Sequence, residues 1–280
     1  TLIVRLWIQI HYITIMRLGV IGCGKMGSAL IKGAVIKGAI QGDEVMVFDT
    51  FRESAEVLSK QVGAQIANSS NDLVRDSEAV LVCVKPQDII SLTSSLDRDR
   101  DGILFISIAA GVKIHDLEKS LIKEDRVIRV MPNTPAVIGK GASAQSRGSN
   151  ATEPDAQFVT NLLNAVGVTL EVPEKQLDAV TGLSGSGPAY IYTVIEAMAD
   201  GGVLVGLPKD QALMLAAQTV SGAAEMIISS KEHPAKLRDQ VSSPGGTTIA
   251  GLAAIESGKL RSTLIEAVQA ATKRSQELGN

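Results

Sequence analysis

The chain is 280 residues long, with 45% hydrophobic residues, 20% charged residues and a formal net charge of −3 at pH 7. These values predict one large or two moderate domains with a substantial core, and they exclude the basic surface that binds nucleic acid or acidic lipid. Cys23 and Cys83 are the only cysteines and both lie in apolar stretches, so we expect no disulfide framework and a reducing cytoplasmic location.

The first fifteen residues form an apolar run that matches no targeting segment. Arg5, Gln9 and His11 interrupt it, and it is shorter than the roughly 20 residues that a membrane-spanning helix needs. It also lacks the basic start and the small-residue cleavage site of a secretory signal. We interpret residues 1–15 as an appendage outside the fold, and we expect no membrane as a partner.

From residue 16 to about residue 172, short apolar runs alternate with amphipathic helical patterns. This alternation predicts a parallel, doubly wound α/β sheet, and the nearly all-apolar strands indicate that helices cover both of its faces. The expected helices include Met26–Lys37 and Ser54–Gln61. The expected strands are Arg17–Ile21, Val45–Phe48, Ala64–Ala67, Ala79–Val84, Ile103–Ile108 and Val127–Val130.

Beyond about residue 173 the chain shows no strand pattern and is dominated by helical runs rich in Ala, Leu and Ile. Proline stands where a first helical turn accepts it, and glycine stands where helices end. We therefore expect an α/β domain over residues 16–173 and an all-α domain over residues 174–280. The expected helices are Pro188–Val205, Pro208–Ser229, Thr247–Ser257 and Lys259–Leu278.

A glycine motif, GCGKMG, follows the first expected strand and opens a helix. Gly22 permits a tight turn, Gly24 lets the backbone approach a pyrophosphate, and Gly27 allows the helix to pack closely on the strand. The helix N-terminus then offers N–H groups and a partial positive charge to the phosphates. The motif predicts a dinucleotide site, and a glycine turn without a ligand is the alternative.

Asp49 ends the second expected strand, about 20 residues after the glycine motif, where dinucleotide sites carry an acid that binds the ribose hydroxyls. Its negative charge would repel a 2′-phosphate and therefore favours NADH. Arg52 follows closely, however, and an arginine there can pair with the 2′-phosphate of NADPH. The sequence favours NADH and leaves NADPH open, and a solvated role for either side chain is the alternative.

Residues that follow the other strands are further candidates, because ligands of such a sheet lie at the carboxyl ends of its strands. Lys85 follows the fourth strand, and its position favours a solvated or phosphate-facing group over a catalytic one. Ala109 and Ala110 follow the fifth strand, where small residues let a flat ring lie against the backbone. After the sixth strand, a proline-stiffened loop is expected to expose Asn133 and Thr134.

Residues 242–252, SSPGGTTIAGL, begin a helix in the C-terminal region in an unusual way. Pro244 fixes one backbone angle and the two glycines after it free the next two, so the chain can turn sharply before the helix. The N–H groups at the helix start can then bind a small anion. An ordinary capped helix after a turn is the alternative.

Taken together, these segments resemble the pyrroline-5-carboxylate reductase family from residue 16 to about residue 278. The most specific segment is EHPAKLRDQVSSPGGTTIAGL, which contains the family's own signature; IGCGKMG, VKP, SIAAGV, RVMPNTPA and DAVTGLSGSGPAY also match. The resemblance implies reduction of 1-pyrroline-5-carboxylate to L-proline with NADPH or NADH, the final step of proline biosynthesis. It also implies a Rossmann domain and a helical domain that interlocks with a partner's to form a homodimer, often assembled further into a decamer.

The resemblance also implies roles for individual residues. At the cofactor it places Ile21, Gly22, Cys23, Gly24, Lys25, Met26, Val84, Lys85, Pro86, Ala109 and Ala110. At the substrate it places Glu174, Ser243, Gly246, Thr247 and Thr248. The family often has an asparagine before the third helix, where an ungapped count here reaches Ser70, with Asn71 next to it. Many relatives also carry a serine- or threonine-rich segment after the second strand, where this chain has FDTFRES.

Reduction of a cyclic imine requires a hydride, which the cofactor supplies, a grip on the substrate carboxylate, and a proton for the nitrogen. Ser243 and the N–H groups of Thr247 and Thr248 can bind a carboxylate without an arginine. The Thr248 hydroxyl can bond the ring nitrogen and pass it a proton through water. Thr248 is therefore the candidate catalytic residue.

Two other classes of protein and a metal site are disfavoured. The 3-hydroxyacid and phosphogluconate dehydrogenases carry a lysine, with an asparagine four residues on, in the helix that here reads PAYIYTVIEAMAD and has neither. A non-catalytic NAD(P)-binding regulator is disfavoured by the intact run Ser242–Thr248. His11, His115 and His233 share no metal-ligand spacing, so no metal is expected.

Overall fold

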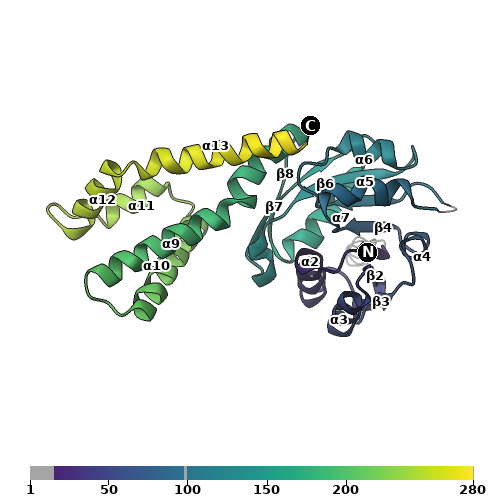
Figure 1. Ribbon diagram of the computed structural model, residues 1–280, viewed down its shortest axis with the longest axis horizontal. Coiled ribbons are helices and arrows are strands. Elements are labelled where there is room, and N and C mark those ends of the chain that lie inside the picture. The colour runs from purple at the N-terminus through teal and green to yellow at the C-terminus, as the bar shows by residue number, and fades with distance from the viewer. Residues whose placement is uncertain (1–15, 98–99, 280) are drawn as a thin grey trace, which may run out of the picture. The chain divides into compact units, whose positions relative to one another are not determined.

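The computed structural model describes residues 16–97 and 100–279, so the predicted appendage lies outside the described residues. The chain forms two compact units. One comprises residues 16–185 together with 272–279, and the other is Ser186–Ala271. The first unit contains a sheet with helices, and the second contains helices throughout its described length (Figure 1).

One eight-stranded sheet forms the centre of the first unit, in the order β3-β2-β1-β4-β5-β6-β7-β8. Neighbouring strands run parallel except β6 and β7, which are antiparallel. The predicted α/β fold class is confirmed, and each predicted strand range contains a strand. The strands are β1 (Leu18–Ile21), β2 (Val45–Phe48), β3 (Gln65–Ile66), β4 (Ala79–Val82), β5 (Leu104–Ser107), β6 (Arg126–Met131), β7 (Gly141–Arg147) and β8 (Gly167–Glu171).

Helices cover both faces of this sheet, which is why β1, β4 and β5 are buried along their whole length. On one face Leu30, Leu58 and Leu162 bring three helices into one apolar cluster with the strands. On the other face Leu73 and Ile89 contribute to a second cluster, formed with three further helices. The helices are α2 (Lys25–Ile36), α3 (Arg52–Val62) and α7 (Glu153–Asn164), and on the other face α4 (Ser70–Arg75), α5 (Pro86–Ser94) and α6 (Ile114–Ser120).

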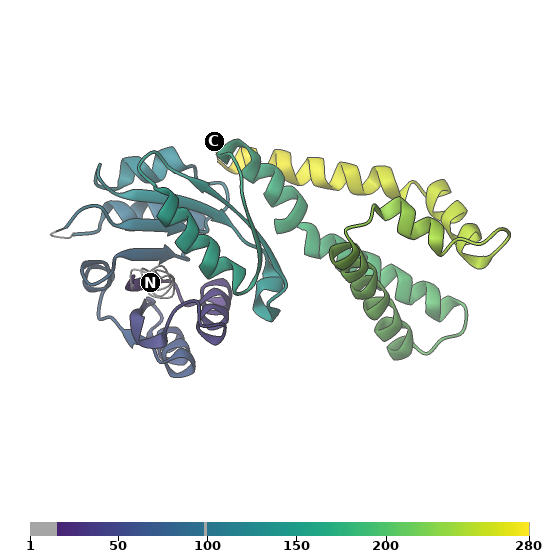
Figure 2. The ribbon, with the colours of Figure 1, turned by 180° about the vertical axis from the view of Figure 1, so that it is seen from behind.

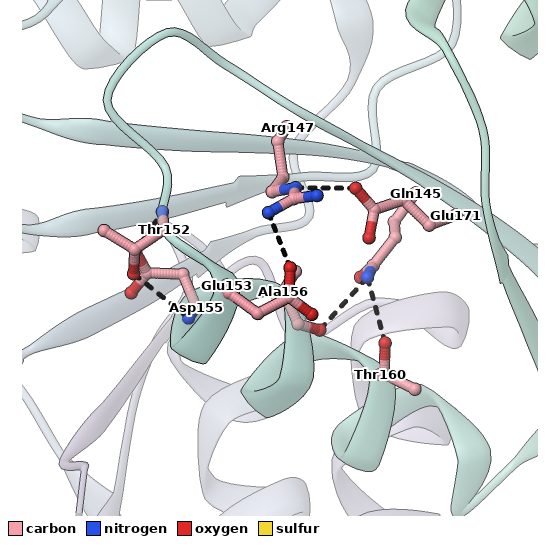
Figure 3. Close-up of polar contacts among 8 residues, drawn as sticks. All are labelled: Gln145, Arg147, Thr152, Glu153, Asp155, Ala156, Thr160 and Glu171. Atoms are coloured by element: carbon pink, nitrogen blue, oxygen red, sulfur yellow. Dashed lines mark hydrogen bonds and ion pairs between the residues drawn. The ribbon is translucent and has the colours of Figure 1, made fainter.

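Strands β7 and β8 are absent from the sequence-based assignment because their residues are not those of a typical buried strand. The sequence of β7 is GASAQSR, and its buried Gln145 donates from Nε2 to the carbonyl oxygen of Ala156 (3.0 Å) and to Oγ1 of Thr160 (2.9 Å) on α7 (Figure 3). β8 is one of the two edge strands, and its Val168 and Leu170 are exposed. Neither strand therefore shows the continuous apolar run of a central strand.

The start of α7 is fixed by a buried carboxylate. Asp155 is fully buried, and its Oδ2 accepts from the backbone N–H (2.8 Å) and the hydroxyl (2.6 Å) of Thr152 (Figure 3). Its Oδ1 accepts from Arg126, whose guanidinium also donates to the carbonyl of Gly102. Glu153, two residues earlier, is exposed and pairs with Arg147 instead. One acid therefore connects α7 to β6, whereas its neighbour lies at the surface.

The second unit consists of helices with little buried surface. Only Ala199, Ala212 and Ala216 form a buried apolar cluster among its described residues, whereas Leu204 and Ile228 are largely exposed. Short helical segments at η3 (Glu174–Gln176), α8 (Leu177–Val180) and the π-helical turn Thr181–Gly185 precede it. Its helices are α9 (Gly187–Leu204), α10 (Lys209–Ser230), α11 (Pro234–Gln240), α12 (Thr247–Ser257) and α13 (Leu260–Leu278) (Figure 2). The last residues of α13, from Thr272 on, belong to the first unit. Helix α11 is absent from the sequence-based assignment.

Helix α10 is the one described helix that is long and apolar enough to cross a membrane. Length and composition are weak evidence for this, because a core helix of a soluble protein passes the same test. Its apolar side chains are mostly exposed within one chain. A helix of this kind can equally be covered by protein.

Candidate active site

A cleft of about 520 Å³ lies at the carboxyl ends of β1, β2 and β4. The strand order reverses between β1 and β4, which is the position where doubly wound sheets bind their ligands. The cleft therefore lies where the sequence predicts the cofactor. It brings together six of the candidate cofactor residues, namely Ile21, Gly22, Gly24, Asp49, Val84 and Lys85, and Phe51 also lines it.

The three motif glycines meet different surroundings. Gly22 has φ +100°, and a Cβ there would lie 2.8 Å from the backbone of Cys83. A Cβ on Gly27 would lie 2.3 Å from the carbonyl oxygen of Gly22, so the start of α2 can approach the turn only because Gly27 lacks a side chain. A Cβ on Gly24 would meet no protein atom within 4 Å. No contact within the protein therefore requires a glycine at position 24.

The start of α2 is open to an anion. Gly24 is its N-cap and provides no side-chain cap, and the first turn contains no acidic residue. Lys25, its first residue, is exposed. The N–H groups and the positive end of the helix dipole are thus available to phosphate oxygens.

We predict that Gly24→Ala weakens binding of NADPH without reducing stability. The added methyl group enters space that the protein leaves open, and a methyl forced against a tightly placed ligand costs about 1–3 kcal/mol, which corresponds to about 5- to 150-fold in Kd. Calorimetric titration gives the Kd, and thermal unfolding checks the fold. Gly201→Ala in α9 is the matched control, since a Cβ there also meets nothing. An unchanged Kd for Gly24→Ala would show that no phosphate group of the cofactor lies against this residue.

Asp49 connects the loop after β2 to the glycine motif. Its Oδ2 accepts from the N–H of Cys23 (2.7 Å), and its Oδ1 accepts from the N–H of Phe51 (2.8 Å). These bonds fix a negative carboxylate at the wall of the cleft. Arg52, the candidate partner for a 2′-phosphate, pairs with Glu56 one helical turn away (3.2 Å). The site therefore carries the fixed negative charge of Asp49, and the nearby positive charge of Arg52 is already paired with Glu56.

An asparagine near Asp49 was not identified from the sequence. Asn68 follows β3 and lines a small cavity of about 180 Å³ together with Asp49 and Arg52. Ser70 is the first residue of α4 and does not line that cavity, and Asn71 accepts from the N–H of Asp97 (3.1 Å). The ungapped count along the sequence reached Ser70 and missed Asn68. The position of Asn68 directly after a predicted strand would have indicated it as a candidate.

Neither cysteine near the glycine motif is a nucleophile. Burial, followed by the negative charge of Asp49, raises the pKa of the Cys23 thiol to about 12. Burial also raises the pKa of the Cys83 thiol, with a smaller contribution from Cys23. Both thiols are free and stay protonated at neutral pH.

The loop after β5 carries Ala109, which is buried, and Ala110, which is half-buried. Neither lines the cleft at β1 and β4. Gly111 has φ +78°, and a Cβ there would touch Leu278 at 3.4 Å. The last turn of α13 therefore packs directly against the loop that the resemblance places beside the cofactor.

The expectation that Asn133 is exposed is wrong. Asn133 is 8% exposed; its Nδ2 donates to the carbonyl of Ser184 (3.0 Å), and its Oδ1 accepts from the N–H of Ala142 (2.8 Å). A buried side-chain amide is normally hydrogen-bonded, and here both polar atoms of the amide have backbone partners. Asn133 therefore joins the loop after β6 to β7 and to the π-helical turn, whereas Thr134 is exposed as predicted.

Glu174 lies in η3 and forms two contacts within the first unit. Its Oε1 accepts from Nη1 of the buried Arg129 on β6 (3.0 Å) and from the N–H of Ile114 at the start of α6 (2.7 Å). The carboxylate therefore connects β6 to the helix that follows the loop of Ala109 and Ala110. Its other oxygen, Oε2, is the atom that would remain for a substrate.

In the second unit, residues 243–248 form a sharp turn followed by an open helix start. Gly245 has φ +66°, a conformation that favours glycine, and a Cβ on Gly246 would lie 2.2 Å from Oγ of Ser243, so a side chain there would displace that hydroxyl. Gly246 is the N-cap of α12 and gives no side-chain cap, and the first turn contains no acid. Ser243 and Thr247 are exposed and Thr248 is half-buried. The first N–H groups of α12 can therefore bind a small carboxylate.

Within residues 16–97 and 100–279, no group of three or more His, Cys, Asp or Glu side chains comes together as a metal site. His233 has a structural contact instead. Its Nδ1 accepts from the N–H of Ala235 (3.2 Å) at the start of α11. The candidate chemistry thus rests on backbone N–H groups, hydroxyls and one carboxylate.

Comparison with known proteins identifies the family. The model for pyrroline-5-carboxylate reductase dimerisation matches residues 174–278, and the model described as NADP oxidoreductase coenzyme F420-dependent matches residues 17–111. The chain is 46% identical over 265 residues to pyrroline-5-carboxylate reductase of Glycine max, covering 93% of this chain and 95% of the relative. This chain belongs to the pyrroline-5-carboxylate reductase family.

Further members of the pyrroline-5-carboxylate reductase family agree with this. The enzyme of Methanosarcina acetivorans is 43% identical, with 94% of this chain and 98% of the relative covered. The solved structure of the Coxiella burnetii enzyme gives a TM-score of 0.89 at 31% identity and covers 95% of this chain and all of that one. The Plasmodium falciparum structure with NADP bound gives 0.82 at 31% identity, covering 95% and 98%. The chain is an oxidoreductase with an NADP-binding type of first domain.

Proposed function

We propose that this chain reduces 1-pyrroline-5-carboxylate to L-proline with NADPH or NADH, the final step of proline biosynthesis. The observation that carries the proposal is the open start of α12, a double-glycine turn with uncapped N–H groups and no acidic residue in its first turn. Family membership supports the same reaction, since the relatives carry this name. The second unit would bind a carboxylate and the first unit a dinucleotide.

The substrate carboxylate would accept hydrogen bonds from the N–H groups of Thr247 and Thr248 and from the hydroxyl of Ser243. Gly246 allows this approach because its lack of a side chain keeps Ser243 against the helix start. A helix N-terminus stabilises the carboxylate charge without an arginine. These contacts would orient the ring so that its C=N bond is presented to the nicotinamide.

The hydride for the imine carbon would come from the reduced nicotinamide of a bound cofactor, and the ring nitrogen would gain a proton. The Thr248 hydroxyl would hydrogen-bond the nitrogen and deliver the proton through water. A cyclic imine is fairly basic, so a strong acid is not required. This agrees with residues 242–248, which contain no His, Asp, Glu or Lys.

The cofactor would bind with its pyrophosphate at the start of α2 and its ribose at Asp49. The cleft supports this, because Gly24, Asp49 and Lys85 line it together. Ile21, Cys23, Lys25 and Met26 belong to the same loop and helix start, and Val84 and Pro86 flank Lys85. Ala109, Ala110 and Ser70 are expected at the cofactor by resemblance to the family.

We expect Glu174 to act mainly as a positioning residue. Its contacts with Arg129 and with the N–H of Ile114 support this role, because they fix the helix after the loop of Ala109 and Ala110. Oε2 would be free to meet the substrate as the resemblance implies. Both roles use one carboxylate.

NADH is the expected preferred cofactor, because the fixed carboxylate of Asp49 would face a 2′-phosphate and Arg52 is paired with Glu56. We predict that Asp49→Ser shifts the ratio of kcat/KM for NADPH to that for NADH upward by about tenfold, which corresponds to loss of about 1.4 kcal/mol of repulsion. The ratio cancels any loss shared by both cofactors when the Asp49 bonds are broken. Glu53→Ser, an exposed acid on the following helix, is the control. An unchanged ratio would show that Asp49 does not reach the ribose.

The chain is expected to work as a homodimer, with a decamer of five dimers as the larger assembly, in the cytoplasm. The match to a dimerisation model over residues 174–278 supports the dimer. So do the exposed apolar side chains of the second unit, which a second copy would remove from water. We expect α10 to be covered in this way and not to cross a membrane, and we expect no nucleic-acid partner.

Oxidation of NADPH and NADH, followed at the nicotinamide absorbance with and without 1-pyrroline-5-carboxylate, tests the function. The proposal predicts oxidation that depends on the imine and yields proline. A folded protein that binds the cofactor but oxidises none of it above background would support a regulator instead.

A further inference from the structure

Phe51 is an aromatic side chain at the wall of the cofactor cleft that no step above uses. Its side chain lines the cleft at the carboxyl ends of β1, β2 and β4, although the residue is 77% exposed. Aromatic residues make up only 3% of the chain. Phe51 is also the one aromatic lining residue of this cleft that is exposed, because Phe48 is half-buried at the end of β2.

The backbone of Phe51 is fixed relative to the glycine motif. The carboxylate of Asp49 accepts from the N–H of Phe51 (2.8 Å) and from the N–H of Cys23 (2.7 Å), so one side chain connects the two loops. Phe51 is also the N-cap of α3. The ring therefore projects from a defined point and does not sit on a free loop.

Each side of the cleft offers an apolar residue to a flat base. In the sheet β1 lies between β2 and β4, so the loops after β2 and β4 flank the glycine motif on opposite sides. Phe51 lies on the β2 side, and Leu92 of α5 lies on the β4 side of the same cleft. The cleft thus has an aromatic residue on one side and an aliphatic residue on the other.

We propose that Phe51 stacks on the adenine ring of the cofactor and that Leu92 covers the other side of the base. This inference rests on the proposed function, because it assigns the adenine end of the same dinucleotide site. The order along the cleft supports it: pyrophosphate at Gly24, ribose at Asp49, and the base next to the residue two positions further on. Stacking on an aromatic side chain contributes about 1–3 kcal/mol per base in other nucleotide sites.

The test is calorimetric titration of the apo dimer with ADP-ribose, with NADH and with reduced nicotinamide mononucleotide, which lacks adenosine. Phe51→Ala should raise the Kd for ADP-ribose and the Kd for NADH by about tenfold each, and it should leave the Kd for the mononucleotide unchanged. Phe51→Tyr should restore the Kd for ADP-ribose, because it retains the ring. Val57→Ala, an exposed apolar residue on α3 that does not line the cleft, is the control and should change none of the three.

Each other result contradicts the inference. Weaker binding of the mononucleotide would place the ring at the nicotinamide end. Equal affinities of Phe51→Ala and the unchanged protein for ADP-ribose would show that no base contacts the ring. Failure of the proposed function has a different signature, since the unchanged protein would then bind ADP-ribose without oxidising NADH in the presence of the imine.

Discussion

Replacing Thr248 with alanine should lower kcat for 1-pyrroline-5-carboxylate by about 100-fold and leave the Kd for NADPH unchanged. We assign the Thr248 hydroxyl to the ring nitrogen, and loss of a single donor at a reacting atom typically costs about 10²–10³-fold. The N–H groups proposed to bind the carboxylate remain in this variant, so KM for the imine should change less than kcat. Steady-state kinetics with saturating cofactor separates the two constants.

Two further variants test whether the loss comes from the hydroxyl of Thr248. Thr248→Ser retains a hydroxyl and should recover most of the lost turnover. Thr219→Ala removes a threonine whose hydroxyl donates to the carbonyl of Leu215 inside α10 (2.7 Å), and it should leave kcat unchanged. If Thr248→Ala retains full catalytic efficiency, then the proton reaches the nitrogen by another route.

Replacing Asp155 with alanine should lower the free energy of unfolding by about 3–5 kcal/mol. The change leaves the charge of Arg126 without its partner and removes both bonds to Thr152, all of them at a fully buried carboxylate. Deleting one partner of a largely buried pair is costly, because Arg126, whose side chain is 25% exposed, loses its carboxylate while its charge stays mostly out of water. Urea denaturation followed by circular dichroism measures the loss.

Glu153→Ala is the matched control for Asp155, because it deletes a carboxylate two residues away on the same helix. Glu153 is 74% exposed in its pair with Arg147, and a surface pair of this kind contributes about 0.2–1 kcal/mol. A difference of less than 1 kcal/mol between the two variants would show that Asp155 does not secure α7. Cofactor affinity at low temperature should be unchanged in both.

The parts of the fold that follow hydrophobic periodicity could be predicted from the sequence. Strands such as β1 and β4 are buried on both faces, so their sequences are continuous apolar runs. The glycine motif and Asp49 were recognisable because a dinucleotide requires small residues and an acid at fixed spacing. The cleft brings Gly22, Gly24 and Asp49 together.

The parts that could not be predicted depend on partners distant in the sequence. Gln145 of β7 donates two hydrogen bonds from Nε2 to α7, and no local pattern shows that α7 will provide these acceptors. The local sequence of Asn133 is that of an exposed loop, and its burial depends on hydrogen bonds with Ser184 and Ala142. The contact of Glu174 with Arg129 likewise joins residues far apart in the chain. Only the folded structure shows these pairings.

The most direct test of the central claim is a crystal structure of the protein grown with L-proline and oxidised cofactor. The proline carboxylate should lie within hydrogen-bond distance of the N–H groups of Thr247 and Thr248, with the ring nitrogen at the Thr248 hydroxyl. Proline bound elsewhere, with residues 243–248 packed away from it, would contradict a substrate site at the start of α12.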